Sequence, residues 1–181
     1  HGAFYAIGAY LAVEITKHLG FMGAVIISPL LVGLLGVLFE RFLLRRFYSA
    51  DPILSLLLTF GLAMVAEQVI RMVWGASPLP ASIPPALKGQ IAVGDFLYSR
   101  YRLMMLGVVV ASLVGIWLLL NKTAFGRVVR AGVQKPDMVA VLGIRLQPYM
   151  TAIVALGVGL AALAGVLLAP ISGVQPAMGA E

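Results

Sequence analysis

The stretch "YMTAIVALGVGLAALAGVLLA", residues 149–169, decides the fold class because it is long, apolar and free of charged side chains. A helix needs about 20 consecutive apolar residues to cross the hydrocarbon core of a bilayer. The composition agrees, since 61% of the 181 residues are hydrophobic and only 11% are charged. A soluble domain is nearer half apolar and a quarter charged, so the sequence indicates an integral membrane protein.

Further apolar runs predict four more spanning helices. The five predicted spans are residues 2–16, 19–39, 53–74, 103–120 and 149–169. The runs lack the two-residue alternation of barrel strands, so the predicted fold is an all-α, polytopic transmembrane helix bundle. Pro29 is expected to kink the second helix. Because His1 takes the place of an initial Met and no basic flank precedes the first run, we interpret the chain as a partial transmembrane domain.

Loop charges predict the orientation of these helices. Loops 40–52 and 121–148 together contain eight of the 13 Lys and Arg residues. Alternating spans place both loops on one side of the membrane, and the positive-inside rule makes that side cytoplasmic. Segment 75–102 is rich in Pro, Gly and Ser, so we predict an extracytoplasmic loop near the membrane surface. Glu40 and Arg41 are expected to anchor the cytoplasmic end of the second helix.

Two sets of residues within the spans are candidates for function or packing. Glu67 and Arg71 lie four residues apart and can pair on one helix face. A structural ion pair is the favoured interpretation, but ionisable residues inside a membrane also mark transport paths. The candidate translocation-path residues are Thr59, Gly61 and Glu67. The candidate helix-packing residues are Gly157, Ala161 and Gly165, which are spaced so that a neighbouring helix can approach closely.

Several kinds of chemistry are absent from the sequence. The chain has no cysteine, which excludes disulfides and Cys-based metal sites, and two histidines are too few for a His-based site. No GxxxxGK[ST] loop is present, so this chain does not hydrolyse ATP by that route. We therefore predict no catalytic residues, no metal site and no cofactor bound by this chain.

Loop 121–148 contains more structure than a simple connection needs. Its central part, "TAFGRVVRAGVQKPDMVAVLGIRL" at residues 123–146, predicts two short helices that are separated at Lys135-Pro136-Asp137. Gly143 has the position of a residue that ends a helix. The expected apolar faces are Val128, Val129, Gly132 and Val133 on the first helix, and Val139, Ala140 and Leu142 on the second. The residues alone leave two interpretations equally open, namely helices resting on anionic lipid and a protein-docking element.

Ordered motifs along the whole chain favour the second interpretation. "HGAFYAIGAYLA", Glu40-Arg41, "LLLTFGLAMVAEQ", "TAFGRVVRAGVQKPDMVAVLGI" and "LAALAGVLLAP" resemble the permease of branched-chain amino-acid ABC transporters, the LivH/LivM type. The resemblance implies that short helices in a cytoplasmic loop couple the permease to an ATPase. The loop departs from the general importer pattern, Glu-Ala-Ala followed by Gly, because it has Arg130-Ala131-Gly132. The coupling residues implied by the resemblance are Gly126, Arg127, Arg130, Ala131, Gly143 and Ile144.

The resemblance also implies a function and a set of partners. The expected protein is a multi-pass permease subunit of an ATP-driven importer for branched-chain amino acids in a bacterial or archaeal inner membrane. Its expected partners are a second permease subunit, cytoplasmic ATPase subunits that carry ATP and Mg²⁺, a periplasmic or extracellular solute-binding protein, and membrane lipid, with no nucleic acid. The alternatives are a permease for urea or short-chain amides, and a secondary transporter or channel, for which midplane polar residues are expected.

Overall fold

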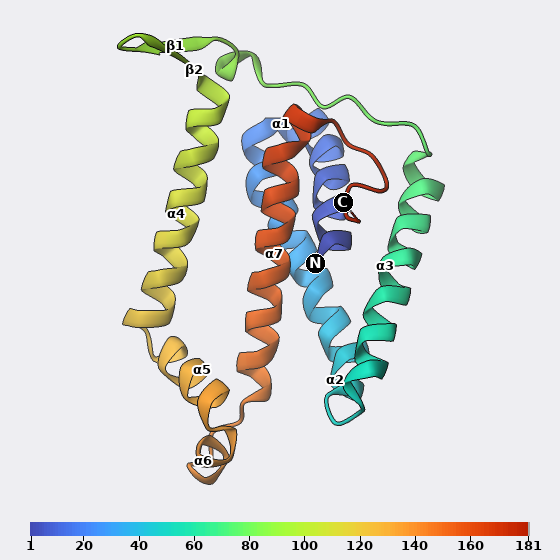
Figure 1. Ribbon diagram of the computed structural model, residues 1–181, viewed down its shortest axis with the longest axis vertical. Coiled ribbons are helices and arrows are strands. Elements are labelled where there is room, and N and C mark those ends of the chain that lie inside the picture. The colour runs from blue at the N-terminus through green and yellow to red at the C-terminus, as the bar shows by residue number, and fades with distance from the viewer. Residues whose placement is uncertain (181) are drawn as a thin grey trace. The chain divides into compact units, whose positions relative to one another are not determined.

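The computed structural model describes residues 1–180, and the chain is predominantly helical (Figure 1). Four helical stretches are long and apolar enough to cross a membrane, which agrees with a polytopic bundle: Gly2–Phe47, Pro52–Trp74, Arg100–Lys122 and Gln147–Ser172. The chain divides into two compact units. The first unit comprises residues 1–82 and the chain from Ile153 onward, and the second comprises residues 83–152.

The elements follow one another in a simple order. The helices are α1 (Gly2–Phe39), α2 (Arg45–Phe47), α3 (Pro52–Trp74), α4 (Arg100–Lys122), α5 (Ala124–Gln134), α6 (Pro136–Val141) and α7 (Gln147–Ser172). A π-helical turn, Glu40–Leu44, joins α1 to α2, and a 3-10 turn, Pro85–Leu87, precedes the strands β1 (Gln90–Val93) and β2 (Phe96–Ser99).

Helix α1 contains two of the predicted spans, divided by a sharp break. Gly20 has φ 75° and ψ 174°, whereas the rest of α1 keeps helical dihedral angles. The sharp change of direction therefore lies at Gly20, close to the gap between the two predicted spans at residues 17–18. The two arms pack against each other. The Ser28 hydroxyl in the second arm donates a buried hydrogen bond of 2.8 Å to the carbonyl oxygen of Gly8 in the first.

Small residues bring α7 into backbone contact with the arm of α1 that precedes Gly20. A Cβ added to Gly8 would lie 2.6 Å from Cα of Ala162, and one added to Gly165 would lie 2.1 Å from the carbonyl oxygen of Tyr5. Among the candidate packing residues, Gly165 is buried in this contact, whereas Gly157 and Ala161 are half-buried beside it. The buried stripe of α7 comprises Val158, Ala162, Gly165, Val166 and Ala169. Such close approach increases the dispersion contacts between the helices. These contacts matter in a membrane, where the hydrophobic effect does not drive helices together.

Helix α3 begins and ends at residues that suit those positions. The Asp51 carboxylate accepts a 3.0 Å hydrogen bond from the amide of Ile53, and Pro52 occupies the first turn. Gly75 ends the helix with φ 90°, a conformation that favours glycine. Near this end, the ring of Trp74 lies 5.3 Å from the ring of Tyr10. Ile70, Tyr10 and Val174 are buried together in the same apolar cluster.

The second unit contains a feature that the sequence interpretation missed. The predicted loop at residues 75–102 includes an antiparallel β-hairpin, in which Val93 pairs with Phe96 across the turn. Gly94 has φ 64° at the first central position of this two-residue turn, which is typical of a II′ hairpin. Helix α4 follows directly and begins at Arg100, three residues before the predicted start.

Candidate functional site

The first candidate site is the module formed by α5 and α6, the two short helices that the sequence predicted between long spans. A sharp corner joins α4 to α5. The Thr123 hydroxyl accepts a hydrogen bond of 3.3 Å from the amide of Gly126 and donates one to the carbonyl oxygen of Leu119. A Cβ on Gly126 would lie 2.1 Å from the carbonyl oxygen of Leu120, so only glycine permits this corner.

Helix α5 has one face against its own unit and one face outward. On the inner face, Val129 is buried, the ring of Phe125 stacks 5.6 Å from that of Tyr149, and Gly132 closely approaches the Leu146 side chain. The outer face comprises Arg127, Arg130, Ala131 and Gln134, which recur at helical spacing and are all exposed. Of the stripe expected at Val128, Val129, Gly132 and Val133, the last residue instead points outward and is 80% exposed.

Helix α6 starts and stops where the sequence predicted. Pro136 occupies its first position, and Gly143 follows its end with φ 76°. The Gly143 amide donates to the carbonyl of Ala140 and the Ile144 amide to that of Val139, which is the Schellman pattern. Only Val139 of the expected apolar face is buried, because Ala140 and Leu142 are exposed.

The module therefore presents apolar side chains outward, where a short hydrophilic turn would present none. These residues are Val133, Met138, Val141 and Leu142, with exposed fractions of 80%, 60%, 88% and 74%. Among the residues expected to couple, Arg127, Arg130 and Ala131 lie on the outer face, while Gly126 and Gly143 shape the corner and the helix end. Arg130 also donates a 3.1 Å hydrogen bond to the Asn121 side chain at the end of α4.

The candidate path residues of α3 do not form one cluster. Glu67 pairs with Arg71, with 2.7 Å between Oε1 and Nη2. Glu67 also borders a cavity of about 470 Å³, whose other walls include Ala3, Ala6, Phe60, Met64 and Ile70. Thr59 borders a different cavity beside His1. Gly61 is exposed and has open space around it. The three candidate path residues therefore do not line one common site.

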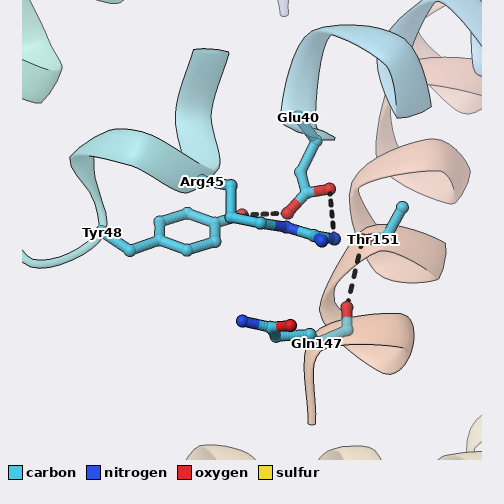
Figure 2. Close-up of polar contacts among 5 residues, drawn as sticks. All are labelled: Glu40, Arg45, Tyr48, Gln147 and Thr151. Atoms are coloured by element: carbon cyan, nitrogen blue, oxygen red, sulfur yellow. Dashed lines mark hydrogen bonds and ion pairs between the residues drawn. The ribbon is translucent and has the colours of Figure 1, made fainter. Parts of the chain in front are cut away.

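A buried polar cluster at Glu40 was not expected from the sequence, although Glu40 does lie at the end of α1 as predicted. Glu40 is fully buried, whereas its expected anchoring partner Arg41 is exposed. Figure 2 shows the contacts of the Glu40 carboxylate, which accepts a 2.9 Å hydrogen bond from the Tyr48 hydroxyl and lies 3.4 Å from Nη2 of Arg45. The π-helical turn supports this pairing, because the Arg45 amide donates to the carbonyl oxygen of Glu40, five residues earlier.

Burial and the neighbouring carboxylate also change the acidity of Tyr48. Desolvation is the larger cause, the hydrogen bond to Glu40 is the next, and together they raise the pKa of Tyr48 to about 12. The phenol therefore remains a hydrogen-bond donor to Glu40 up to a higher pH than a free tyrosine would. A signal for the cluster is present in the sequence, since Glu40 ends an apolar run and Arg45 and Tyr48 follow within eight residues.

Comparison with known proteins identifies the family of the chain. The family described as "Branched-chain amino acid transport system / permease component" matches residues 1–181. The chain is 24% identical to the high-affinity branched-chain amino acid transport system permease protein BraD of Pseudomonas aeruginosa, over 99% of this chain and 63% of the relative. It is 24% identical to the permease protein LivH of Escherichia coli K12, over 96% of this chain and 61% of the relative.

An archaeal protein is similar to the same extent. The probable branched-chain amino acid transport permease protein LivH of Methanocaldococcus jannaschii is 25% identical, over 98% of this chain and 58% of the relative. The chain thus covers about three fifths of the length of these relatives. No solved structure matches it. Because the family match extends over the whole chain, the protein belongs to the permease components of branched-chain amino acid transport systems.

Proposed function

We propose that this chain is part of the membrane-spanning permease subunit of an ATP-driven importer for branched-chain amino acids. The family match over residues 1–181 and the printed functions of the bacterial and archaeal relatives support this proposal. The subunit would lie in the inner membrane of a bacterium or an archaeon, beside a second permease subunit. A periplasmic or extracellular solute-binding protein would deliver the substrate.

The observation that carries the proposal is the outward-facing surface of the α5–α6 module. Exposed apolar residues surrounded by arginines are typical of the centre and rim of a protein interface. Here Met138, Val141 and Leu142 would form the apolar centre, and Arg127 and Arg130 would lie at the rim. The excess of Lys and Arg in loop 121–148 favours the cytoplasmic side, where an ATPase subunit would bind this surface.

The module is also joined firmly enough to transmit movement. Gly126 packs against the last turn of α4, and Arg130 donates to Asn121 at the end of that helix. On the other side, the Phe125–Tyr149 ring stack connects α5 to the beginning of α7. Closure of two ATPase subunits would therefore displace α5 together with the ends of α4 and α7 as one body. ATP and Mg²⁺ would be bound by those ATPase subunits.

The experiment that tests the proposal combines Val141→Asp with Leu142→Asp in the full-length permease that contains these residues. Both side chains are mainly exposed, so the thermal stability of the purified protein should change little. Co-purification of the ATPase subunits and uptake of labelled leucine should both be lost. Met138→Leu is the matched control, since it keeps the apolar surface.

Charge reversal addresses the rim of the same surface. Arg127→Glu with Arg130→Glu should weaken ATPase association and uptake, while Arg46→Glu, an exposed arginine in the other basic loop, serves as the control. Intact association and uptake in both the aspartate and the glutamate variants would refute the assignment of α5–α6 as the coupling element. If no ATPase subunit co-purifies with the unaltered permease, the importer proposal itself is wrong.

A further inference from the structure

The β1–β2 hairpin has two chemically different faces. Residues directly opposite in an antiparallel pair share a face, and successive residues alternate between faces. The observed register pairs Ile91 with Tyr98 and Val93 with Phe96, so these four side chains lie on one face, the apolar hairpin face. Their exposed fractions are 40%, 47%, 56% and 69%, in the order Ile91, Tyr98, Val93, Phe96.

The opposite face is more polar. It comprises Gln90, Ala92, Leu97 and Ser99, of which only Leu97 is a large apolar residue. On the apolar hairpin face, the rings of Phe96 and Tyr98 are neighbours, with their centroids 6.5 Å apart. A two-stranded hairpin cannot bury such a face within itself. Something outside the hairpin must therefore cover these four side chains.

The connection to α4 places the hairpin beside the membrane surface. Ser99 ends β2 and Arg100 begins α4, with no loop between them. The Arg100 amide donates a 3.2 Å hydrogen bond to the carbonyl oxygen of Gly89, which ties the other end of the hairpin to the same point. Since a strand rises about 3.3 Å per residue, four residues extend at most about 13 Å from the start of the spanning helix. The whole hairpin thus remains close to the headgroup region.

The charges near the base of the hairpin match a lipid surface. Lys88, Arg100 and Arg102 lie at the base and are exposed, whereas the one carboxylate, that of Asp95, lies at the turn. Cations near the surface are attracted by anionic headgroups, and tyrosines are common at membrane interfaces. Tyr98 on the apolar hairpin face suits that position, and Asp95 at the tip can remain in water.

We propose that the apolar hairpin face lies on the lipid surface where α4 enters the membrane, with its side chains at the boundary between headgroups and acyl chains. The opposite face, with Gln90 and Ser99, is in contact with water. The hairpin thereby acts as an interfacial anchor that sets the depth and tilt of α4. This role is independent of the substrate that the permease carries.

The experiment measures the depth of spin labels on the hairpin. Residues 1–181 contain no cysteine, so single cysteines can be introduced after any cysteine elsewhere in the full-length permease has been replaced by serine. The variants are Ile91→Cys and Phe96→Cys on the apolar hairpin face, with Ala92→Cys and Leu97→Cys as matched controls on the opposite face. Each labelled permease is reconstituted into vesicles of phosphatidylcholine and phosphatidylglycerol, and power saturation compares its accessibility to oxygen and to a water-soluble nickel complex.

The proposal expects an alternating pattern along each strand. The ratio of oxygen to nickel accessibility should be about twofold or more higher at positions 91 and 96 than at 92 and 97, because oxygen concentrates in the bilayer. Equal ratios at all four positions would overturn the proposal. It would also be overturned if positions 91 and 96 were exposed to nickel in vesicles and became shielded only when a purified soluble solute-binding protein is added.

Discussion

Glycine allows close backbone approach in two regions of the molecule, the α1–α7 contact and the α5–α6 module. The neighbouring apolar side chains point inward in the first region and outward in the second. In the first, Gly8 and Gly165 allow backbones to touch, and the surrounding apolar side chains point inward. In the second, Gly126 allows one sharp corner, after which Val141 and Leu142 point outward. Apolar residues next to a close backbone contact therefore stabilise the fold only where a second helix covers them. Where none covers them, as on α6, they stay exposed, and this exposure is what supports the proposal that a partner binds there.

The largest effect is expected from closing the space between α1 and α7. In Gly165→Val, the added Cβ would collide with the backbone carbonyl of Tyr5, which cannot rotate away as a side chain would. Overpacking of this kind should cost about 3 kcal/mol of unfolding free energy. We expect a strongly lowered Tm and aggregated protein on size exclusion in detergent. Gly107→Val, at a glycine with open space around it, is the control and should leave both measurements almost unchanged.

The next effect concerns a polar contact in the same unit as the α1–α7 contact. Glu40→Gln removes the carboxylate that faces Arg45 while keeping an acceptor for Tyr48. Because the Arg45 side chain is 30% exposed, the cost should be about 2 kcal/mol, below that of breaking a fully buried pair. Thermal unfolding of the single variant and of Glu40→Gln with Arg45→Met measures this cost. If the double variant is no more stable than the single one, the ion pair is not the source of the loss.

A smaller loss of unfolding free energy is expected from a substitution at Gly143 in the α5–α6 module. Gly143→Ala places a side chain at φ 76°, which costs roughly 1 kcal/mol. We expect faster hydrogen exchange at the Gly143 and Ile144 amides, which complete the end of α6, with little change in Tm. Gly143→Asn should show a weaker effect, since asparagine tolerates this conformation. A large drop in Tm for Gly143→Ala would mean that the module stabilises the whole fold, against the comparison above.

The smallest effect concerns the half-exposed phenol of Tyr48. Its pKa is raised from 10.0 to about 12, so the folded state favours the protonated form. The contribution of Tyr48 to stability should be fully present below pH 10 and should disappear as the pH rises through about 12. The difference in phenolate absorbance between the unaltered protein and Tyr48→Phe measures this titration. A midpoint near 10 would show that neither the burial of Tyr48 nor its hydrogen bond to Glu40 holds in solution.

Much of the α5–α6 module was predictable because its determinants are local. Pro136 suits a helix start, Gly143 suits a helix end, and both act through the backbone conformation of the residue itself. Gly94-Asp95 between apolar residues is a local signal for the β-hairpin and its register. It was missed because the proline-rich sequence before it indicates an irregular loop. The exposure of Val133 and Leu142 was not predictable, because the sequence does not show whether another element covers the apolar face of a helix.

The membrane-spanning helices could be predicted from the sequence alone, because a run of about 20 uncharged apolar residues has few alternative structures in a bilayer. The sequence also predicted the short helices between two of the spans, through residues that begin and end a helix. Tertiary packing was needed to establish that Gly165, rather than Gly157 or Ala161, is buried against α1. It was also needed to establish that Glu40 is buried and contacts the partly exposed Arg45 and Tyr48. The reason is physical: a helix carries small or polar residues on several faces, and the neighbour that packs against it selects which face is buried.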